Sequence, residues 1–233
     1  MTKLNRGAAW LMLVAGAMSA GLSGCRHHHG SWGRDGFRSD SHSESGSISI
    51  SKMGGGIDLD SAPHGATLST MGGEIHVVDV GSYLKAKTMG GGIDVDRSAG
   101  SVDVATMGGD ITIGSANGPI KASTMGGEIR ARMVGTSSGG ERDIDLTSHG
   151  GTITLRVPKD FPMEVQITLV HTQNAPREYH IDDHIGLEQR DSEDWDDSKG
   201  TPRKYLRAKG QVGDGSNHVT INTINGDVIL KQE

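Results

Sequence analysis

The apolar residues of the chain recur with a period of 18 between residues 47 and 131. In each unit, two apolar residues lie five and three positions before a Met-Gly-Gly sequence, and two more lie four and six positions after its methionine. Apolar residues two positions apart are typical of a β-strand with one buried face. Each unit therefore predicts two short strands joined by a glycine-containing turn. The five methionines are Met53, Met71, Met89, Met107 and Met125.

The period continues after Met125, although the methionine is lost. Residues 144–155 repeat the two apolar pairs around His149, which lies 24 positions after Met125. Six residues have therefore been inserted, and we place them within 135–141. Residues 219–230 repeat the pairs once more around Ile224. Seven units are expected in total.

One such unit cannot bury its own apolar face, but units stacked about 4.8 Å apart form continuous apolar columns. We therefore expect an all-β, single-domain β-solenoid (β-helix) of 18-residue, right-handed coils that spans residues 47–230. A hexapeptide β-helix needs an apolar residue every six positions, which this chain lacks. A calcium-binding nonapeptide roll needs Gly and Asp where this chain has Ile57 and Leu59.

The repeat also explains the unusual glycine content. Glycine supplies 36 of the 233 residues, twice its ordinary share of about 7%. We expect the glycines to turn the chain at every level through positive φ. We expect the methionines to stack in register as a flexible apolar ladder inside the solenoid.

Charged residues on the outward positions alternate in sign from unit to unit. One column holds Asp58, His76, Asp94, Thr112 and Arg130, and another holds Lys85, Asp103 and Lys121. Like charges are thus two levels apart, about 9.6 Å, which is near the Debye length. We interpret both columns as suited to stacking and solubility. The alternative is a carboxylate ladder that binds metal or cleaves sugar.

The first 25 residues have the pattern of a bacterial export signal. Lys3 and Arg6 precede an uncharged stretch, 7–24, whose apolar part is too short to span a bilayer well. It ends in Leu-Ser-Gly-Cys25, which resembles the lipobox of bacterial lipoproteins. The resemblance implies a signal peptide at 1–24 and lipidation of Cys25, the only cysteine. A lipid there would anchor the protein without a spanning helix.

Residues 25–46 are rich in Gly, Ser and His, which predicts a flexible tether between the lipid and the folded domain. The tether contains three consecutive histidines, 27–29. Consecutive histidines in a flexible segment lack the preset geometry of a metal site, so metal capture there is only an alternative.

The period stops between Leu155 and Val219. Residues 164–169 alternate like a strand, and a polar excursion follows at about 171–215, acidic in its first half and basic in its second. This charge order predicts a hairpin or loop that folds back on itself and covers the open end of the solenoid.

One cluster in the excursion has ligand chemistry. His180 and His184 would meet one ion on a helix, with Asp182 assisting, but no further Cys or His lies at metal-site spacing. We therefore expect a solvated loop and keep these three residues as weak metal candidates. No Gly-x-Ser-x-Gly sequence or phosphate-binding loop is present, and no catalytic residue is assigned.

The Met-Gly-Gly repeats, the Leu-Arg-Val-Pro sequence at 155–158 and the closing sequence 219–230 resemble a bacterial adhesin-like family of β-strand repeats, a domain of unknown function. The resemblance implies an exported or surface-attached β-helix and supplies no catalytic residues. It covers residues 47–230.

We therefore expect a non-catalytic, lipid-anchored protein of the bacterial cell envelope, without a cofactor, that acts as an adhesin or envelope scaffold. Its expected partners are the membrane, through the lipid, and an envelope protein or polysaccharide. Nucleic acid is excluded by the formal net charge of −6. A polysaccharide-binding or polysaccharide-processing β-helix is the alternative, disfavoured by an aromatic content of 3%. Metal binding through the histidines is the third possibility.

Overall fold

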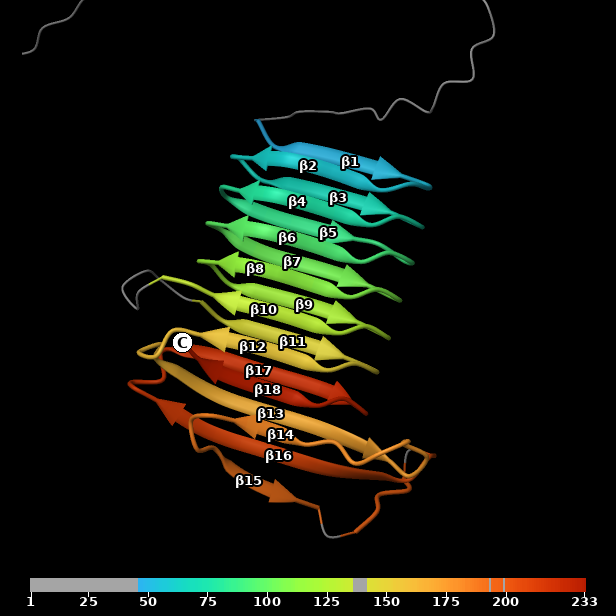
Figure 1. Ribbon diagram of the computed structural model, residues 1–233, viewed down its shortest axis with the longest axis vertical. Coiled ribbons are helices and arrows are strands. Elements are labelled where there is room, and N and C mark those ends of the chain that lie inside the picture. The colour runs from blue at the N-terminus through green and yellow to red at the C-terminus, as the bar shows by residue number, and fades with distance from the viewer. Residues whose placement is uncertain (1–45, 136–141, 193, 199) are drawn as a thin grey trace, which may run out of the picture. The chain divides into compact units, whose positions relative to one another are not determined.

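Each 18-residue unit forms two β-strands, as the spacing of its apolar residues predicts (Figure 1). The structure is a computed structural model and describes residues 46–135, 142–192, 194–198 and 200–233. In these ranges the regular elements are 18 strands, and no helix there has the length and hydropathy to cross a membrane. The expected signal peptide, Cys25, almost all of the tether, and the site of the insertion, 136–141, lie outside the described residues.

Twelve strands form a regular stack. They are β1 (Ile48–Lys52), β2 (Ile57–Ala62), β3 (Ala66–Thr70), β4 (Ile75–Val80), β5 (Tyr83–Lys87), β6 (Ile93–Ser98), β7 (Ser101–Thr106), β8 (Ile111–Ala116), β9 (Ile120–Thr124), β10 (Ile129–Met133), β11 (Ile144–Ser148) and β12 (Ile153–Val157). Six more strands follow. They are β13 (Met163–Thr172), β14 (Ile181–Asp183), β15 (Glu188–Asp191), β16 (Arg203–Val212), β17 (Asn217–Ile224) and β18 (Val228–Gln232).

The strands form two sheets, one on each side of the core. The first sheet has the order β1-β3-β5-β7-β9-β11-β17-β13-β16-β15, and the second has the order β14-β18-β12-β10-β8-β6-β4-β2. Neighbours in the stack are parallel and offset by one unit, so that Ile75 pairs with Ile93 and Ile93 with Ile111. The β-solenoid predicted from the repeat is confirmed, and its right-handed coiling stays a prediction.

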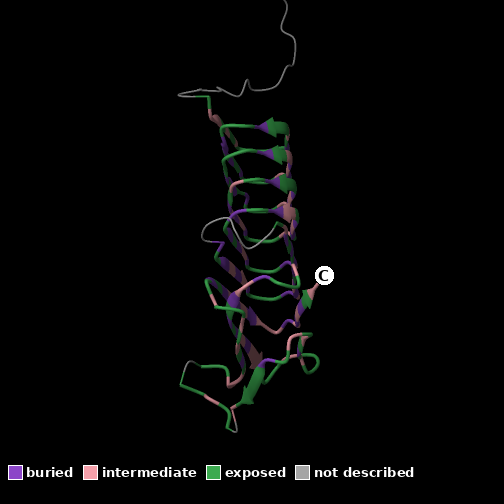
Figure 2. Ribbon diagram, turned by 90° about the vertical axis from the view of Figure 1, so that its left-hand side faces the viewer, coloured by how far each residue is buried: buried purple, intermediate pink, exposed green. Residues whose placement is uncertain are grey.

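The apolar pairs of each unit point inward and form the core. Buried and exposed residues alternate along the strands (Figure 2), as in β3, where Ala66, Leu68 and Thr70 are buried and the residues between them are exposed. The inward column of the second sheet begins with Ile57, Ile75 and Ile93, each at most 1% exposed. Because every level repeats this pattern, the columns are continuous.

Close stacking of the turns, rather than positive φ, requires the second glycine of each Met-Gly-Gly after the first one, in which Gly55 has open space beside it. A Cβ on Gly91 would lie 2.2 Å from the carbonyl oxygen of Gly73, one coil away, and a Cβ on Gly109 would lie 2.3 Å from that of Gly91. Of the five glycine pairs, only Gly55 contributes a positive φ, of 80°. The expectation of positive φ at every level is therefore wrong. The backbones of successive turns lie against one another and leave no room for a side chain.

A buried hydroxyl column links the turns from one level to the next. Thr88 Oγ1 donates a hydrogen bond to the Gly73 carbonyl at 2.8 Å and accepts one from the Gly91 N–H at 3.3 Å. Thr106 does the same with Gly91, at 2.7 Å, and Gly109, at 3.3 Å. The hydroxyl column comprises Thr70, Thr88, Thr106, Thr124, Ser148 and Thr223. These hydroxyl groups donate hydrogen bonds to turn carbonyls of the preceding level.

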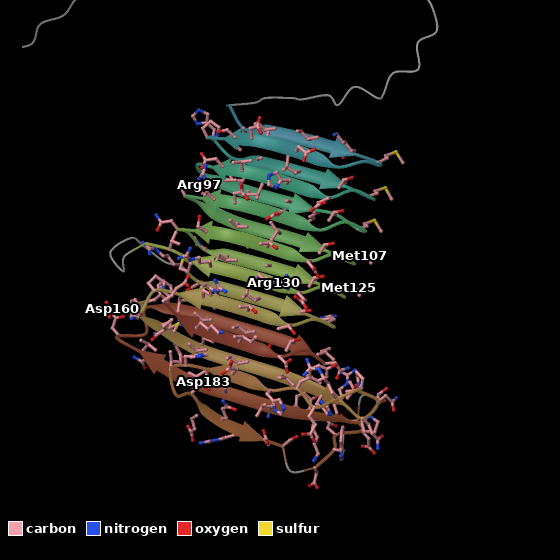
Figure 3. All side chains as sticks on the ribbon, viewed as in Figure 1. Arg97, Met107, Met125, Arg130, Asp160 and Asp183 are labelled. Atoms are coloured by element: carbon pink, nitrogen blue, oxygen red, sulfur yellow. The ribbon has the colours of Figure 1, made fainter. Side chains whose placement is uncertain are left out.

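The methionines stack in register but lie outside the solenoid, so the expected internal ladder is wrong. Met53 is 86% exposed, and the other four are 49–53% exposed. Figure 3 shows Met107 and Met125 side by side at one edge of the stack. The reason is the alternation of the strand: the preceding Thr106 or Thr124 points inward to its hydroxyl bonds, so the methionine that follows points outward. We call these five residues the methionine ladder.

The C-terminal part places the last unit of the sequence inside the stack rather than at its end. β17 pairs with β11 on one side and with β13 on the other, and β18 lies between β12 and β14. The chain therefore leaves β12, forms the terminal level with β13 and β14, and returns to fill the level between them (Figure 1).

β16 pairs antiparallel with the whole length of β13, and β15 pairs antiparallel with β16. We call residues 163–212, which contain β13 to β16, the cap. Within the cap, β16 and β15 continue the first sheet beyond β13. β15 is the free edge of this sheet, and its four residues are all exposed. A short, charged edge strand resists pairing with other chains.

Candidate functional site

A pocket of about 320 Å³ lies in the cap. Its walls come from four segments: the end of β13, the connection from β13 to β14, the chain that follows β15, and β16. Three of its lining residues are aromatic: Tyr179, Trp195 and Tyr205. We call it the aromatic pocket. It combines flat apolar rings with carboxylate, imidazole, hydroxyl and ammonium groups.

Two of the three rings of the aromatic pocket, those of Tyr179 and Trp195, lie against His171 on β13. The His171 and Tyr179 ring centroids are 5.9 Å apart with an edge-on geometry, and those of His171 and Trp195 are 6.1 Å apart. Trp195 remains 40% exposed, so part of its surface is available to a ligand. Such ring pairs contribute about 0.5–1.5 kcal/mol beyond the area that they bury.

A basic side chain lies over each of the three aromatic rings. The Arg177 guanidinium lies 4.5 Å from the centre of Tyr179, Lys204 Nζ lies 5.3 Å from that of Trp195, and the Arg207 guanidinium lies 5.0 Å from that of Tyr205. Cation–π contacts at exposed sites contribute about 0.5–1 kcal/mol each. These contacts hold the rings in place although the pocket is open to solvent.

Asp227, from the last unit of the repeat, anchors the wall of the aromatic pocket to the stack. Its carboxylate accepts hydrogen bonds from Arg177 Nη2 at 2.5 Å and from the His180 backbone N–H at 2.9 Å. Partial burial opposes ionisation of Asp227, but the hydrogen bonds from Arg177 and His180 outweigh it and lower the pKa of Asp227. The segment that carries Tyr179 is therefore tied to β18, which begins at the next residue.

Asp183 holds the turn between β14 and β15 (Figure 3). Its Oδ1 accepts the N–H groups of Gly186 at 2.6 Å and Leu187 at 2.8 Å, and its Oδ2 accepts Gln189 Nε2 at 2.7 Å. Burial opposes ionisation here too, but these hydrogen bonds outweigh it and lower the pKa of Asp183. Both oxygens of the Asp183 carboxylate therefore accept hydrogen bonds that stabilise the turn.

The weak metal candidates lie on and beside a strand rather than in a loop, although His180, Asp182 and His184 are exposed to solvent as expected. Ile181–Asp183 forms β14 and pairs with β18, and the helical spacing that would join His180 to His184 does not occur. His180 lines the aromatic pocket. His184 Nδ1 lies 3.3 Å from the Leu230 carbonyl and 4.0 Å from Asp182 Oδ1. In the part of the chain that the structure describes, these three residues do not form a group that could hold a metal.

The potential metal ligands that do gather are His76, Asp94 and Asp96, with one ligand atom of each within 4.8 Å of the others. They lie on the outward face of β4 and β6, where His76 Nδ1 is 3.9 Å from Asp94 Oδ2. Arg97 and Asp79 make a similar cross-strand pair at 3.6 Å between the same two strands. The group therefore has the geometry of the exposed ion pairs beside it.

The aromatic pocket was not anticipated from the sequence. The available signal was the distribution of aromatic residues, because three of them lie within 179–205 whereas the repeats contain only Tyr83. The overall content of 3% conceals this concentration. The expectation that the low aromatic content disfavours an aromatic-lined site is wrong for the cap.

Comparisons of the chain with protein-family models, with curated proteins and with solved structures gave no match. The resemblance to the adhesin-like repeat family therefore rests on the motifs quoted above and stays a prediction.

Proposed function

We propose that the protein is a non-catalytic lipoprotein of the bacterial cell envelope, an adhesin whose solenoid supports a cap that binds envelope polysaccharide. The observation that carries this proposal is the aromatic pocket at one end of the stack. β1 and the cap strand β15 are the two ends of the first sheet. An anchor on Cys25 precedes β1 in the sequence, so the regular stack would act as a spacer between the membrane and the pocket.

The chemistry of the aromatic pocket favours a saccharide. The C–H faces of a sugar ring pack on aromatic rings, and its hydroxyl groups need both donors and acceptors. Trp195, Tyr179 and Tyr205 supply the rings, whereas Glu178 and Lys204 supply an acceptor and a donor. A volume of about 320 Å³ is near the lower limit of ligand pockets. A chain end or a short segment of polysaccharide is the best fit.

Binding without turnover is favoured by the exposure of the carboxylates. Glu178 and Asp191 line the aromatic pocket and are both exposed to water. Glycoside hydrolysis needs one carboxyl group whose surroundings raise its pKa and a second at a fixed distance across the substrate. Exposed carboxylates on an open wall are not held by packed neighbours at a fixed separation across a substrate.

Retention of the full-length protein on immobilised envelope polysaccharide tests the proposal. Trp195→Ala should weaken binding about 10-fold, because it removes a stacking surface of roughly 1.5 kcal/mol. Tyr83→Ala is the matched control, since Tyr83 is a half-exposed aromatic residue of the stack, 36% exposed, and it should bind like the parent. Equal binding by Trp195→Ala and the parent, or no retention of either, would reject the saccharide site. Release of reducing ends that Asp191→Asn abolishes would reject the non-catalytic assignment.

The anchor is tested separately by fractionation. Cys25→Ala should release the protein from membranes or leave it as an uncleaved precursor. A Cys25→Ser variant that is processed and sediments with membranes like the parent would contradict the lipoprotein assignment. Neither result depends on the pocket.

A further inference from the structure

The methionine ladder is an exposed row of sulfur ligands with one member at each level. The turns that carry it stack directly: a Cβ on Gly90 would lie 3.8 Å from the Met71 carbonyl, and one on Gly108 would lie 3.8 Å from the Met89 carbonyl. The methionines are therefore in register, and neighbouring thioethers leave the stack in the same direction at one edge (Figure 3).

Packing does not account for methionine at these positions. Met71, Met89 and Met107 are half exposed, whereas the buried columns of the same units consist of Ile, Val, Leu and Ala. Side chains that are half exposed gain less from burial than the fully buried core residues do, and the turn itself does not require a thioether. The repeated use of one residue type points to a property of the thioether itself.

The column of the methionine ladder continues with a histidine, a residue type that also binds metals. At the sixth level the position is occupied by His149, whose backbone N–H donates a hydrogen bond to the Thr124 carbonyl at 3.1 Å, directly beside Met125. An apolar docking stripe would be interrupted by an exposed imidazole, whereas a column of soft-metal ligands is not. The presence of histidine at this position of the repeat therefore favours a column of metal ligands over an apolar docking surface.

We propose that the methionine ladder, extended by His149, binds soft monovalent cations of the Cu(I) and Ag(I) class between adjacent levels. Thioethers are neutral, soft ligands that prefer Cu(I) over hard divalent ions, and imidazole is also a copper ligand. Levels about 4.8 Å apart are close to twice a metal–sulfur distance of about 2.3 Å, so one ion can bridge two neighbours. Glu74 and Asp110, three positions after a ladder methionine, add negative potential that attracts cations.

Titration of the full-length protein, labelled with ¹³C at the methionine methyl groups, tests this site with Ag(I) as the probe. The resonances of Met71, Met89, Met107 and Met125 should shift. Those of Met133 and Met163 should not, because these side chains are 2% and 0% exposed and provide internal controls. Ladder resonances that stay unchanged at saturating Ag(I) would overturn the proposal.

A competition assay against a chromophoric Cu(I) chelator then compares the parent with the double variant Met89→Leu, Met107→Leu. Leucine keeps the apolar surface and removes sulfur, so the melting temperature should be unchanged while Cu(I) affinity falls at least about tenfold. Cys25 and the tether histidines are the same in both proteins, so the difference reports the ladder alone. His149→Met should retain Cu(I) binding and His149→Leu should weaken it. Equal affinity of the parent and the double variant would assign copper to the tether and reject the ladder.

Discussion

The regular stack is built from parallel strand pairs, whereas the strands of the cap pair with one another antiparallel. In the stack, every level repeats one set of contacts, so that Thr88 and Thr106 bond the turns in the same way. In the cap, antiparallel β16 and β15 bring different side chains together only once. Repetition provides rigidity without a unique site, and the interrupted part of the chain provides the unique site.

The two regions are also joined differently. Levels of the stack follow one another along the chain, whereas the level of β17 and β18 is completed by residues that follow the cap. Glu233, at the end of the chain, donates its N–H to the Val157 carbonyl at 3.0 Å and pairs through its side chain with Arg132 at 2.5 Å. The C-terminal unit thus lies between the stack and the cap and pairs with both.

The largest effect is expected from a side chain placed between two turns of the stack. Gly109→Ala should destabilise the protein by about 2–4 kcal/mol, because its Cβ would lie 2.3 Å from the Gly91 carbonyl oxygen and the backbone must move. Gly108→Ala is the control: its Cβ would lie 3.7 Å from the nearest atom and should cost little. Unfolding in denaturant measures both. Similar losses for the two variants would mean that the turns do not stack as described.

A loss of about 1–3 kcal/mol is expected from Thr106→Val, because the partly buried Gly91 carbonyl loses its hydroxyl donor and the Gly109 N–H loses its acceptor. Thr106→Ser keeps the hydroxyl and should retain most of the stability, as Ser148 does at its own level. The same unfolding experiment measures both variants. If the valine and serine variants are equally stable, the hydroxyl column does not stabilise the stack.

Acid should loosen the cap before it unfolds the stack. The folded-state pKa of Asp227 is lowered, so its stabilising contribution is complete above the unfolded value of about 3.9 and is lost as the pH falls below that value toward the folded pKa. The fluorescence of Trp195 should therefore change at a higher pH than the far-ultraviolet circular dichroism of the strands. Asp227→Asn should make the cap less stable at neutral pH and remove part of this acid transition. Coincident acid transitions in both signals would show that cap and stack unfold as one unit.

The smallest effect is expected from a charge on the methionine ladder. Met89→Asp should change stability by less than about 0.5 kcal/mol, because Met89 is 49% exposed and contributes little to the core. Asp94→Asn, at a partly exposed outward position of the same coil, should have a similarly small effect. Thermal unfolding measures the stability of both variants. A loss of several kcal/mol for Met89→Asp would mean that the methionine ladder is buried inside the solenoid.

The sequence by itself determined the strands of the stack and their register. The apolar pairs recur with the two-residue period of a half-buried strand and with an 18-residue spacing, so each unit carries the same information about which side chains point inward. The side on which the ladder lies was not determined in this way. A residue at the junction of strand and turn can point either way, and the hydrogen bonds of Thr88 and its equivalents decided the orientation.

Only the tertiary structure decided the level order and the aromatic pocket. The periodic pattern predicts which strands exist and cannot place β17 between β11 and β13, because parallel pairing is compatible with any neighbour of matching pattern. Leu169, Tyr179, Trp195 and Tyr205 share no period and lie on four separate segments. Antiparallel pairing of β13 with β16 and the anchoring of Arg177 by Asp227 bring them together. Such contacts depend on the path of the chain in space, which no local pattern of apolar residues encodes.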